Sequence, residues 1–373
     1  MTRIAITSEA ELADVIRGRD APLEIIGAGT KRDYGKPLEN LDVLDVSALS
    51  GILSYEPEEL VITARAATPV AEIEAAIAEK NQRLGFDPAD WGPLFGAPAS
   101  KATIAGALSA DTSGSARVRF GGARDHLLGY RAVNGLGEAY KAGGRVVKNV
   151  TGFDLPKLIC GAMGTLGVLT EVTLRLVPRA HASATLVVKD IQPGEGLALL
   201  RRVWSSPLEA TGLAYVHEWA AAYIRLEGGP TPLKDKIASL RTLLHGMEVL
   251  KVADGEATFR KIGSGAVFID QSLDIWRICV PPSEAAKTAE AIASPRWLAD
   301  WAGGLLWVGM NETADLHDIA KRAGGHATLM RASVETRSRI PVFPPEEEIR
   351  AALTRSVKAA FDPKDLFNPG RMG

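Results

Sequence analysis

The stretch that decides the fold is KNVTGFDLPKLICGAMGTLGVLTE, residues 148–171. Its glycines stand among apolar residues, and this spacing allows the backbone to approach a large flat ligand. Residues 168–176 then alternate between apolar and polar side chains, which is typical of a strand in a sheet. We therefore expect a ligand-contacting turn that leads directly into a strand.

A second glycine motif, Gly27-Ala28-Gly29-Thr30-Lys31, follows the short apolar run of residues 23–26. A strand that ends in glycines can point main-chain N–H groups at a bound anion. Alone, the motif is equally typical of a plain turn, and it lacks the third glycine of the dinucleotide-binding fingerprint because Arg32 holds that position. Together the two motifs predict a pyrophosphate-containing cofactor, and they do not indicate a nicotinamide.

The composition is that of a globular protein long enough for two domains. The chain has 373 residues, of which 46% are hydrophobic and 24% charged, and its formal net charge is −2. Because nucleic acid requires a concentrated basic face, this balance argues against such a partner. No apolar run approaches the roughly 18 residues that span a bilayer, and residues 1–7 lack a signal-peptide core. We expect a cytoplasmic protein with no membrane span of its own.

The cysteines and histidines are not spaced along the sequence as the ligands of a metal site usually are. The two cysteines, Cys160 and Cys279, can form neither a disulfide framework nor an iron–sulfur cluster. The histidines are scattered, and His326 has no second histidine or acidic residue at ligand spacing. We expect no metal site. A substrate carboxylate could instead pair with one of three arginines, namely Arg331, Arg337 and Arg339.

The order of predicted elements indicates an α+β fold in two parts. Helices and strands alternate up to about residue 85, and residues 129–147 predict a hairpin. A boundary falls at Pro178, beyond which new strands, including 266–270, alternate with helices. Trp297 and Trp301 have helical spacing, which favours packing of both in the second core.

Five segments in this order resemble a known flavoprotein fold: GAGTK (27–31), ATIAGALSADTSG (102–114), FGGARDHLLG (120–129), the 148–176 block and FDPKDLFNPGR (361–371). The resemblance is to the FAD-binding fold of the vanillyl-alcohol-oxidase and p-cresol-methylhydroxylase (PCMH) superfamily. Within it, the chain is similar to the smaller FAD-binding subunits of bacterial glycolate oxidase, also called glycolate dehydrogenase. The resemblance is dense over residues 1–178 and the final dozen residues, and loose in between.

The resemblance implies three regions. Residues 1–178 would form a two-subdomain PCMH-type FAD-binding domain. Residues 179–340 would form an α+β domain on a mainly antiparallel sheet, acting as a cap, substrate or assembly domain. Residues 341–373 would form a C-terminal segment that returns to the FAD domain.

The resemblance also implies which residues bind FAD. Since the first glycine motif has no histidine of the kind that some relatives attach covalently to flavin, FAD would be bound noncovalently. Ala105 stands where many relatives carry a glycine. The implied cofactor-binding residues are Gly27, Ala28, Gly29, Thr30, Lys31, Ala102, Thr103, Ile104, Gly106, Ser113, Gly114, Gly121, Asn149, Gly164, Gly167, Val168, Asn368 and Arg371.

The implied function is oxidation of glycolate, a small 2-hydroxy acid, to glyoxylate with flavin as hydride acceptor. The implied partners are a larger FAD-binding subunit and an iron–sulfur subunit, through which the complex could lie at the periphery of the inner membrane. The missing metal motif favours an accessory or electron-relay role, and no catalytic residue is assigned. Two alternatives stay open: a self-sufficient D-lactate-type dehydrogenase or alcohol oxidase, and a scaffold subunit without flavin.

Overall fold

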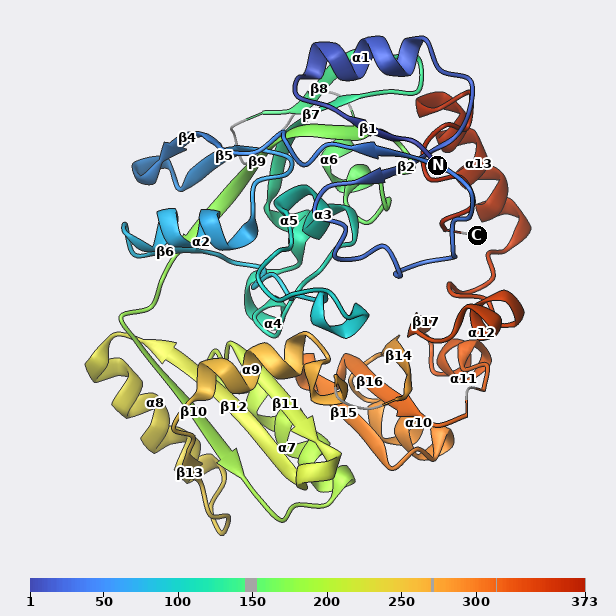
Figure 1. Ribbon diagram of the computed structural model, residues 1–373. Coiled ribbons are helices and arrows are strands. Elements are labelled where there is room, and N and C mark those ends of the chain that lie inside the picture. The colour runs from blue at the N-terminus through green and yellow to red at the C-terminus, as the bar shows by residue number, and fades with distance from the viewer. Residues whose placement is uncertain (145–152, 270–271, 313, 373) are drawn as a thin grey trace. The chain divides into compact units, whose positions relative to one another are not determined.

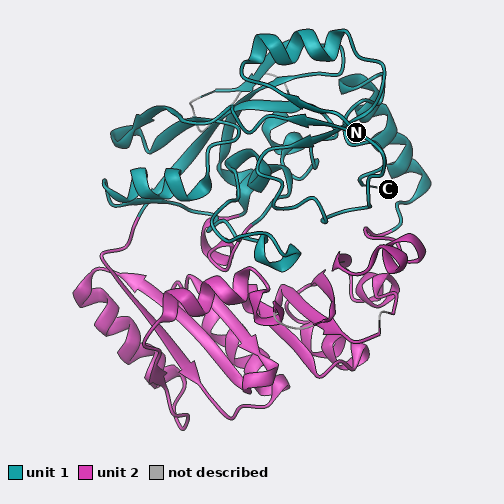
Figure 2. Ribbon diagram, viewed as in Figure 1, with its two compact units in different colours: residues 1–112, 122–178, 345–373 teal, residues 113–121, 179–344 magenta. Residues whose placement is uncertain are grey.

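The computed structural model describes residues 1–144, 153–269, 272–312 and 314–372. They divide into two compact units (Figure 2). Unit 1 comprises residues 1–112, 122–178 and 345–373, and unit 2 comprises residues 113–121 and 179–344. Residues 113–121 thus group with unit 2, although the sequence places them inside the predicted FAD-binding domain. Both units combine helices with sheets, so the predicted α+β class is confirmed.

A small parallel sheet in unit 1 carries the first glycine motif (Figure 1). Its strands lie in the order β1 (Arg3–Ala5), β3 (Asp42–Asp45) and β2 (Leu23–Ile26). Parallel strands of one sheet need crossover connections, and α1 (Glu9–Arg17) connects β1 to β2, the two strands that flank β3. The Ser8 hydroxyl caps this helix by accepting a hydrogen bond from the Glu11 N–H.

The second sheet of unit 1 is antiparallel and is organised around one long strand, β9 (Val168–Pro178). This strand is the one that the 168–176 pattern predicts. A hairpin is also present as β7 and β8, with its second strand earlier in the chain than the predicted 143–147, of which residues 145–147 lie outside the described residues. The other strands are β4 (Ile52–Glu56), β5 (Val61–Arg65), β6 (Gln82–Leu84), β7 (Leu127–Val133) and β8 (Ala139–Gly143).

Helices of unit 1 bury apolar side chains against the β9 sheet. Ile73 and Ile77 of α2 and Ile104 of α3 share one core cluster with Val172 and Leu174 of β9. Leu84 of β6 joins them in the same cluster. The helices of this unit, besides α1, are α2 (Val70–Ala78), α3 (Ile104–Ser109), α5 (Ala123–His126), α6 (Leu155–Ile159) and α13 (Glu348–Phe361).

Unit 2 is built on one eight-stranded sheet in which every paired neighbour runs antiparallel. Its strands, in spatial order, are β13 (Leu250–Lys251), β10 (Ala182–Val188), β12 (Ala221–Gly228), β11 (Gly212–Val216), β15 (Arg296–Asp300), β16 (Leu305–Met310), β14 (Asp274–Cys279) and β17 (His326–Arg331). Its helices are α4 (Arg117–Phe120), α7 (Pro193–Trp204), α8 (Pro230–Leu243), α9 (Gly255–Gly263), α10 (Ala285–Ile292), α11 (His317–Arg322) and α12 (Val334–Arg339).

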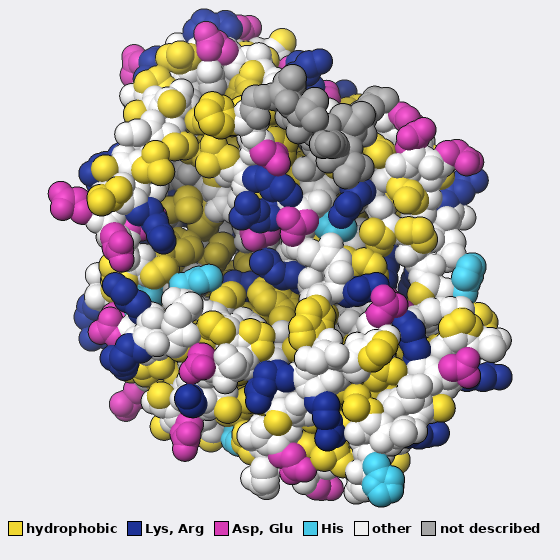
Figure 3. Space-filling model, turned by 180° about the vertical axis from the view of Figure 1, so that it is seen from behind, with side chains coloured by type: hydrophobic (Ala, Val, Ile, Leu, Met, Phe, Trp, Pro, Cys, Tyr) yellow, Lys and Arg dark blue, Asp and Glu magenta, His cyan; other side chains and the backbone are white. Residues whose placement is uncertain are grey.

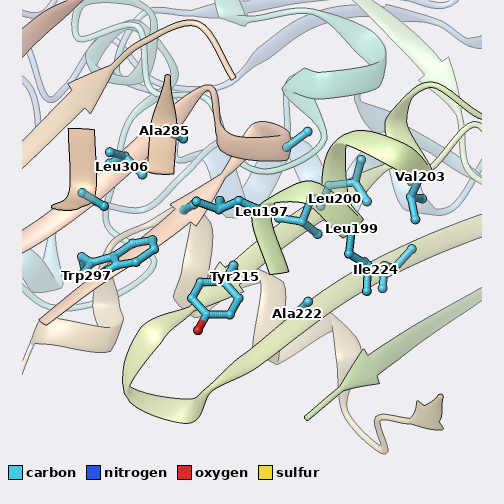
Figure 4. Packing of buried hydrophobic residues seen from close by; sticks show 14 of the residues in the cluster. Leu197, Leu199, Leu200, Val203, Tyr215, Ala222, Ile224, Ala285, Trp297 and Leu306 are labelled. Carbon is cyan, nitrogen blue, oxygen red and sulfur yellow. The ribbon is translucent and has the colours of Figure 1, made fainter. Parts of the chain in front are cut away.

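One face of this sheet carries the core of unit 2. Leu197 and Leu200 of α7 pack there with Tyr215 and Ile224 (Figure 4). Trp276 and Ile278 of β14 belong to the same cluster, as does Val280 directly after the strand. Because side chains alternate along a strand, Arg277 and Cys279 lie on the opposite face.

Two local predictions for unit 2 are wrong. The run 266–270 was expected to be a strand, but Ala266–Phe268 is a 3₁₀ turn that follows Gly265, whose φ is +68°. Residues 297–301 are not helical, since Trp297 lies on β15 and belongs to the core cluster, whereas Trp301 begins the 3₁₀ turn that follows this strand. The two indoles therefore lie in different surroundings, one in the core and one at the turn after the strand.

Candidate functional site

A pocket of about 100 Å³ in unit 1 brings the first glycine motif together with residues far away in the sequence. Residues 24–32 and Tyr34 form one wall. Thr103, Gly106, Ser109 and Ala110, from α3 and its two flanking residues, form a second wall. Met163, Asn368 and Arg371 complete the lining.

The glycines at the end of β2 are required by space and by backbone conformation. A Cβ at Gly27 would lie 3.1 Å from the Thr103 hydroxyl oxygen, closer than ordinary van der Waals contact. Gly29 has a φ of +69°, which favours glycine. The chain can therefore turn sharply after the strand and keep its main chain at the pocket surface.

Thr103 joins the glycine loop to α3. Its hydroxyl accepts a hydrogen bond of 3.3 Å from the Gly106 N–H and so caps the helix. Its main chain is fixed on both sides, because the Val70 N–H donates to the Ala102 carbonyl and the Ile104 N–H donates to the Thr68 carbonyl. The start of the second wall is thus anchored to residues 68–70.

Lys31 supplies a partly buried positive charge. Its ammonium donates a hydrogen bond of 3.3 Å to the Thr30 hydroxyl, and a Cβ at Gly106 would lie 3.7 Å from it. Burial lowers the pKa of Lys31 to about 8, against the opposing attraction of the Asp90 carboxylate. An ammonium in this condition gains from a bound anion, which would restore the stabilisation lost with water.

Residues 366–368 extend the small parallel sheet beyond β2. The Leu23 N–H donates to the Leu366 carbonyl at 2.7 Å, and the Asn368 N–H donates to the Leu23 carbonyl at 3.0 Å. The Asn368 side chain then connects two more segments. Its Oδ1 accepts from the Ile25 N–H at 2.9 Å, and its Nδ2 donates to the Met163 carbonyl at 2.8 Å.

Arg371 fixes the far end of the glycine loop. Its guanidinium donates to the main-chain carbonyls of Lys31 and Arg32, at 3.2 and 2.5 Å. It also lies 3.8 Å from the carboxylate of Glu24, which is buried and paired with the Arg32 guanidinium as well. The carboxylate therefore holds two arginines beside the pocket, and Lys31 adds a third positive charge.

The pocket contains half of the predicted FAD residues: Gly27, Ala28, Gly29, Thr30, Lys31, Thr103, Gly106, Asn368 and Arg371. Ala102, Ile104, Gly164, Gly167 and Val168 belong to unit 1 but do not line it. Gly164 is nevertheless close, because a Cβ there would lie 2.9 Å from Asn368 Nδ2.

The remaining predicted residues lie elsewhere. Ser113, Gly114 and Gly121 belong to unit 2, where the Gly114 carbonyl accepts a hydrogen bond from the Trp301 indole N–H. Asn149 lies outside the described residues. The part that each of these residues plays toward FAD stays a prediction.

Several pocket residues were missed from the sequence: Glu24, Ile25, Ile26, Tyr34, Ala110 and Met163. Glu24 had a usable signal, since an acidic residue within an apolar strand needs a basic partner when buried. Met163 had none, because its place depends on a main-chain hydrogen bond of 2.8 Å to the Ser109 carbonyl.

The candidate carboxylate-binding arginines are not part of this pocket. Arg331 donates to the main-chain carbonyls of Leu273 and Phe268, and Arg337 is buried. Arg339 is exposed on α12. Among the described residues, no group of three or more His, Cys, Asp or Glu is placed to hold a metal ion.

Two features of the structure concern possible partners: the distribution of surface charge and the apolarity of the helices. Acidic and basic side chains are interspersed on the face shown in Figure 3, as expected for a formal net charge of −2. Across the described ranges, no helix combines the length and apolarity needed to cross a bilayer.

Comparisons with known proteins identify an FAD-binding domain in this chain. Residues 3–143, which include both of its main walls, match the FAD binding domain family. The p-cresol methylhydroxylase structure has a TM-score of 0.75 with this chain at 14% identity, covering 100% of this chain and 88% of that one. The fold is therefore the PCMH-type flavoprotein fold, and the protein is an FAD-dependent oxidoreductase.

The closer relationship extends over nearly the whole chain. The glycolate oxidase subunit GlcE of Escherichia coli is 35% identical over 352 residues, covering 94% of this chain and 92% of GlcE. The glycolate oxidase subunit GlcD of Bacillus subtilis is 30% identical over 167 residues, but these are 44% of this chain and 34% of GlcD. The chain belongs to the family of the glycolate oxidase subunit GlcE.

Proposed function

We propose that this chain is an FAD-binding subunit of a glycolate oxidase complex and takes part in the oxidation of glycolate to glyoxylate. The observation that carries the proposal is the match to GlcE over 92% of that protein's length. The pocket in unit 1 supports it with chemistry suited to one component of FAD, the diphosphate.

The pocket residues fit a diphosphate in three respects. The chain turns at Gly27 and Gly29 where a side chain would be crowded or strained. The Lys31 ammonium is partly buried and lies beside the Thr30 hydroxyl. Arg371 and Asn368 hold the loop in place, through hydrogen bonds to the Lys31 carbonyl and from the Ile25 N–H. When bound, FAD would supply the hydride acceptor for a 2-hydroxy acid.

We propose that FAD is held without a covalent bond. Residues 24–34 contain no histidine or cysteine, and the loop residues contribute main-chain groups, hydroxyls and positive charge. Complete release of FAD on denaturation of the purified protein is the expected result. Flavin absorbance that stays with the precipitated polypeptide would contradict this part of the proposal.

The proposed partners are a larger GlcD-type flavoprotein subunit and an iron–sulfur subunit. The relatives GlcE and GlcD are each named as subunits of glycolate oxidase. Cys160 and Cys279 belong to different units, so electrons that leave the flavin need a cluster on another chain. Through these partners the complex could lie at the inner membrane.

The test compares the chain alone with the chain co-expressed with both partners. We expect FAD in the purified chain, and glycolate-dependent reduction of an artificial acceptor only in the complex. Rapid turnover of glycolate or D-lactate by the chain alone would instead favour a self-sufficient dehydrogenase. A colourless chain that binds no added FAD would favour the scaffold alternative.

A further inference from the structure

A cluster of basic side chains surrounds Cys279 in unit 2, on the sheet face opposite the core. Cys279 ends β14 and pairs across the ladder with His326, whose side chain is hydrogen-bonded to it. Arg277 lies on the same face, two residues earlier in β14. On the other neighbouring strand, β16 places Leu305 opposite Cys279. Cys279 as a whole residue is of intermediate exposure.

Two of the basic groups are held by one indole. The guanidinium carbons of Arg117 and Arg277 lie 4.7 and 5.1 Å from the centroid of the Trp301 ring, within cation–π range. Arg117 comes from residues 113–121, the segment that the sequence assigned to the other domain. The cluster therefore joins residues from three separate parts of the chain.

Trp301 is itself fixed by polar contacts. Its indole N–H donates to the Gly114 carbonyl at 3.0 Å, and its main-chain N–H donates to Asp300 Oδ1 at 2.7 Å. The Ser115 hydroxyl donates to the other oxygen of this buried carboxylate at 2.6 Å. Trp301 also has a φ of +54°, which is uncommon for a bulky residue. The fold thus holds this ring, and the two arginines beside it, in a defined place.

The surroundings change the acidity of the thiol. Burial acts to raise the pKa of Cys279, but Arg277, His326 and Arg117 together lower it to about 7. Cys160 in unit 1 is the opposite case, since burial and the Asp111 carboxylate raise its pKa. Its Sγ donates to the Leu108 carbonyl at 3.2 Å.

We propose that Cys279, Arg277, Arg117 and His326 form a second ligand site that takes a small 2-oxo acid as a reversible thiol adduct. The arginines pair with the carboxylate, and the thiolate attacks the carbonyl carbon. The Arg117 and Arg277 guanidiniums supply the positive charge that attracts an anionic ligand. This inference rests on the proposed function, because glyoxylate, the product of glycolate oxidation, is a 2-oxo acid with a reactive aldehyde carbon.

The step needs no oxidant or reductant. One C–S bond forms as the sulfur lone pair adds to the carbonyl carbon, and the π electrons of the C=O bond move to its oxygen. That oxygen takes one proton from water, which gives a hemithioacetal. The reverse reaction returns the thiolate and the free acid, so the site would respond to the concentration of product.

The test uses two alkylating reagents that differ in charge, iodoacetate and iodoacetamide, with modification of each cysteine followed by mass spectrometry. At pH 7, we expect the iodoacetate-to-iodoacetamide rate ratio at Cys279 to exceed that of free cysteine by about fivefold. Cys160 is the control within the same molecule and should react slowly with both. Glyoxylate should protect Cys279, and uncharged propionaldehyde should protect it much less.

Two variants distinguish loss of the proposed site from loss of the folded state. Arg277→Gln should lower the ratio toward that of free cysteine and weaken protection by glyoxylate. Because Arg277 packs on Trp301, His326→Gln, which changes an exposed residue, is made in parallel, and thermal melting is recorded for both. A rate ratio at Cys279 equal to that of free cysteine, or equal protection by glyoxylate and propionaldehyde in the folded wild type, would overturn the inference. The alkylation needs no flavin, so this result is separate from glycolate oxidation.

Discussion

The Arg371 guanidinium donates a hydrogen bond of 3.2 Å to the main-chain carbonyl of Lys31, a residue 340 positions earlier in the chain. The same guanidinium faces the buried Glu24 carboxylate. The glycine loop is therefore held from outside by a distant segment, and its conformation is not a local property of residues 27–31.

Removing this contact should loosen the loop. We expect Arg371→Met to weaken FAD binding at least about tenfold and to lower the free energy of unfolding by about 2 kcal/mol, because it removes hydrogen bonds to a charged group. Arg350→Met, an exposed arginine on α13, is the matched control. FAD titration and thermal melting measure the two effects. Unchanged affinity in Arg371→Met would show that the loop keeps its shape without this contact.

Lys31 should make FAD binding dependent on pH. Its pKa is about 8 in the free protein, and a bound diphosphate raises it because the anion favours the ammonium. FAD affinity should be constant well below pH 8. It should fall as the pH rises through 8, by up to about tenfold per unit until the raised pKa of the complex is reached.

Two substitutions at Lys31 separate charge from titration. Lys31→Arg stays protonated and should bind FAD with little pH dependence between about pH 7 and 9.5. Lys31→Met should bind weakly at every pH, whereas Lys101→Met, at an exposed lysine, should match the wild type. Calorimetric titration across this range is the measurement, and an unchanged pH slope in Lys31→Met would rule out Lys31 as its source.

Gly27→Ala tests the space between the two pocket walls. The added methyl would meet Thr103 Oγ1 at 3.1 Å, so either the loop or α3 must shift. We expect about a tenfold loss of FAD affinity, corresponding to about 1.4 kcal/mol, with secondary structure retained. Gly194→Ala, where a Cβ meets nothing within 4 Å, is the control and should behave as wild type. Equal affinities of the two variants by fluorescence titration would contradict the prediction.

Ser115→Ala tests the anchor of residues 113–121 in unit 2. The substitution removes one donor to the buried Asp300 carboxylate and should lower the free energy of unfolding by about 1–3 kcal/mol. Ser50→Ala, at an exposed serine, should cost much less. Denaturant melts of both variants give the comparison, and a Ser115→Ala midpoint equal to that of wild type would mean that the carboxylate finds another donor.

The sequence predicts some parts of this protein well because their chemistry is local. The glycine loop at 27–31 follows from backbone conformation, and β9 follows from alternation of side chains over residues 168–176. The resemblance placed Ser113 and Gly114 in the first domain, but both group with unit 2, where the Gly114 carbonyl accepts a hydrogen bond from the Trp301 indole 187 positions away. No local sequence pattern predicts packing between residues so far apart in the chain.

Trp301 is a second residue whose packing could not be predicted from a local sequence pattern. Its spacing of four from Trp297 fits one face of a helix, but the same spacing in a strand carries no such meaning. Asp300 ends β15, and its carboxylate accepts the Trp301 N–H as the chain turns into a left-handed conformation. The indole then meets Arg117 and Arg277 and not the apolar core.

The pairing of Leu23 with Phe367 has a consequence for biosynthesis. A ribosome makes residues 23–31 long before residues 366–371. For most of translation, the nascent polypeptide therefore lacks the C-terminal residues that line the pocket. We therefore expect tight cofactor binding only after residue 371 has emerged. Riboflavin starvation should therefore leave full-length, nearly folded apoprotein that can be reconstituted later, and ribosome-bound fragments should take up no flavin.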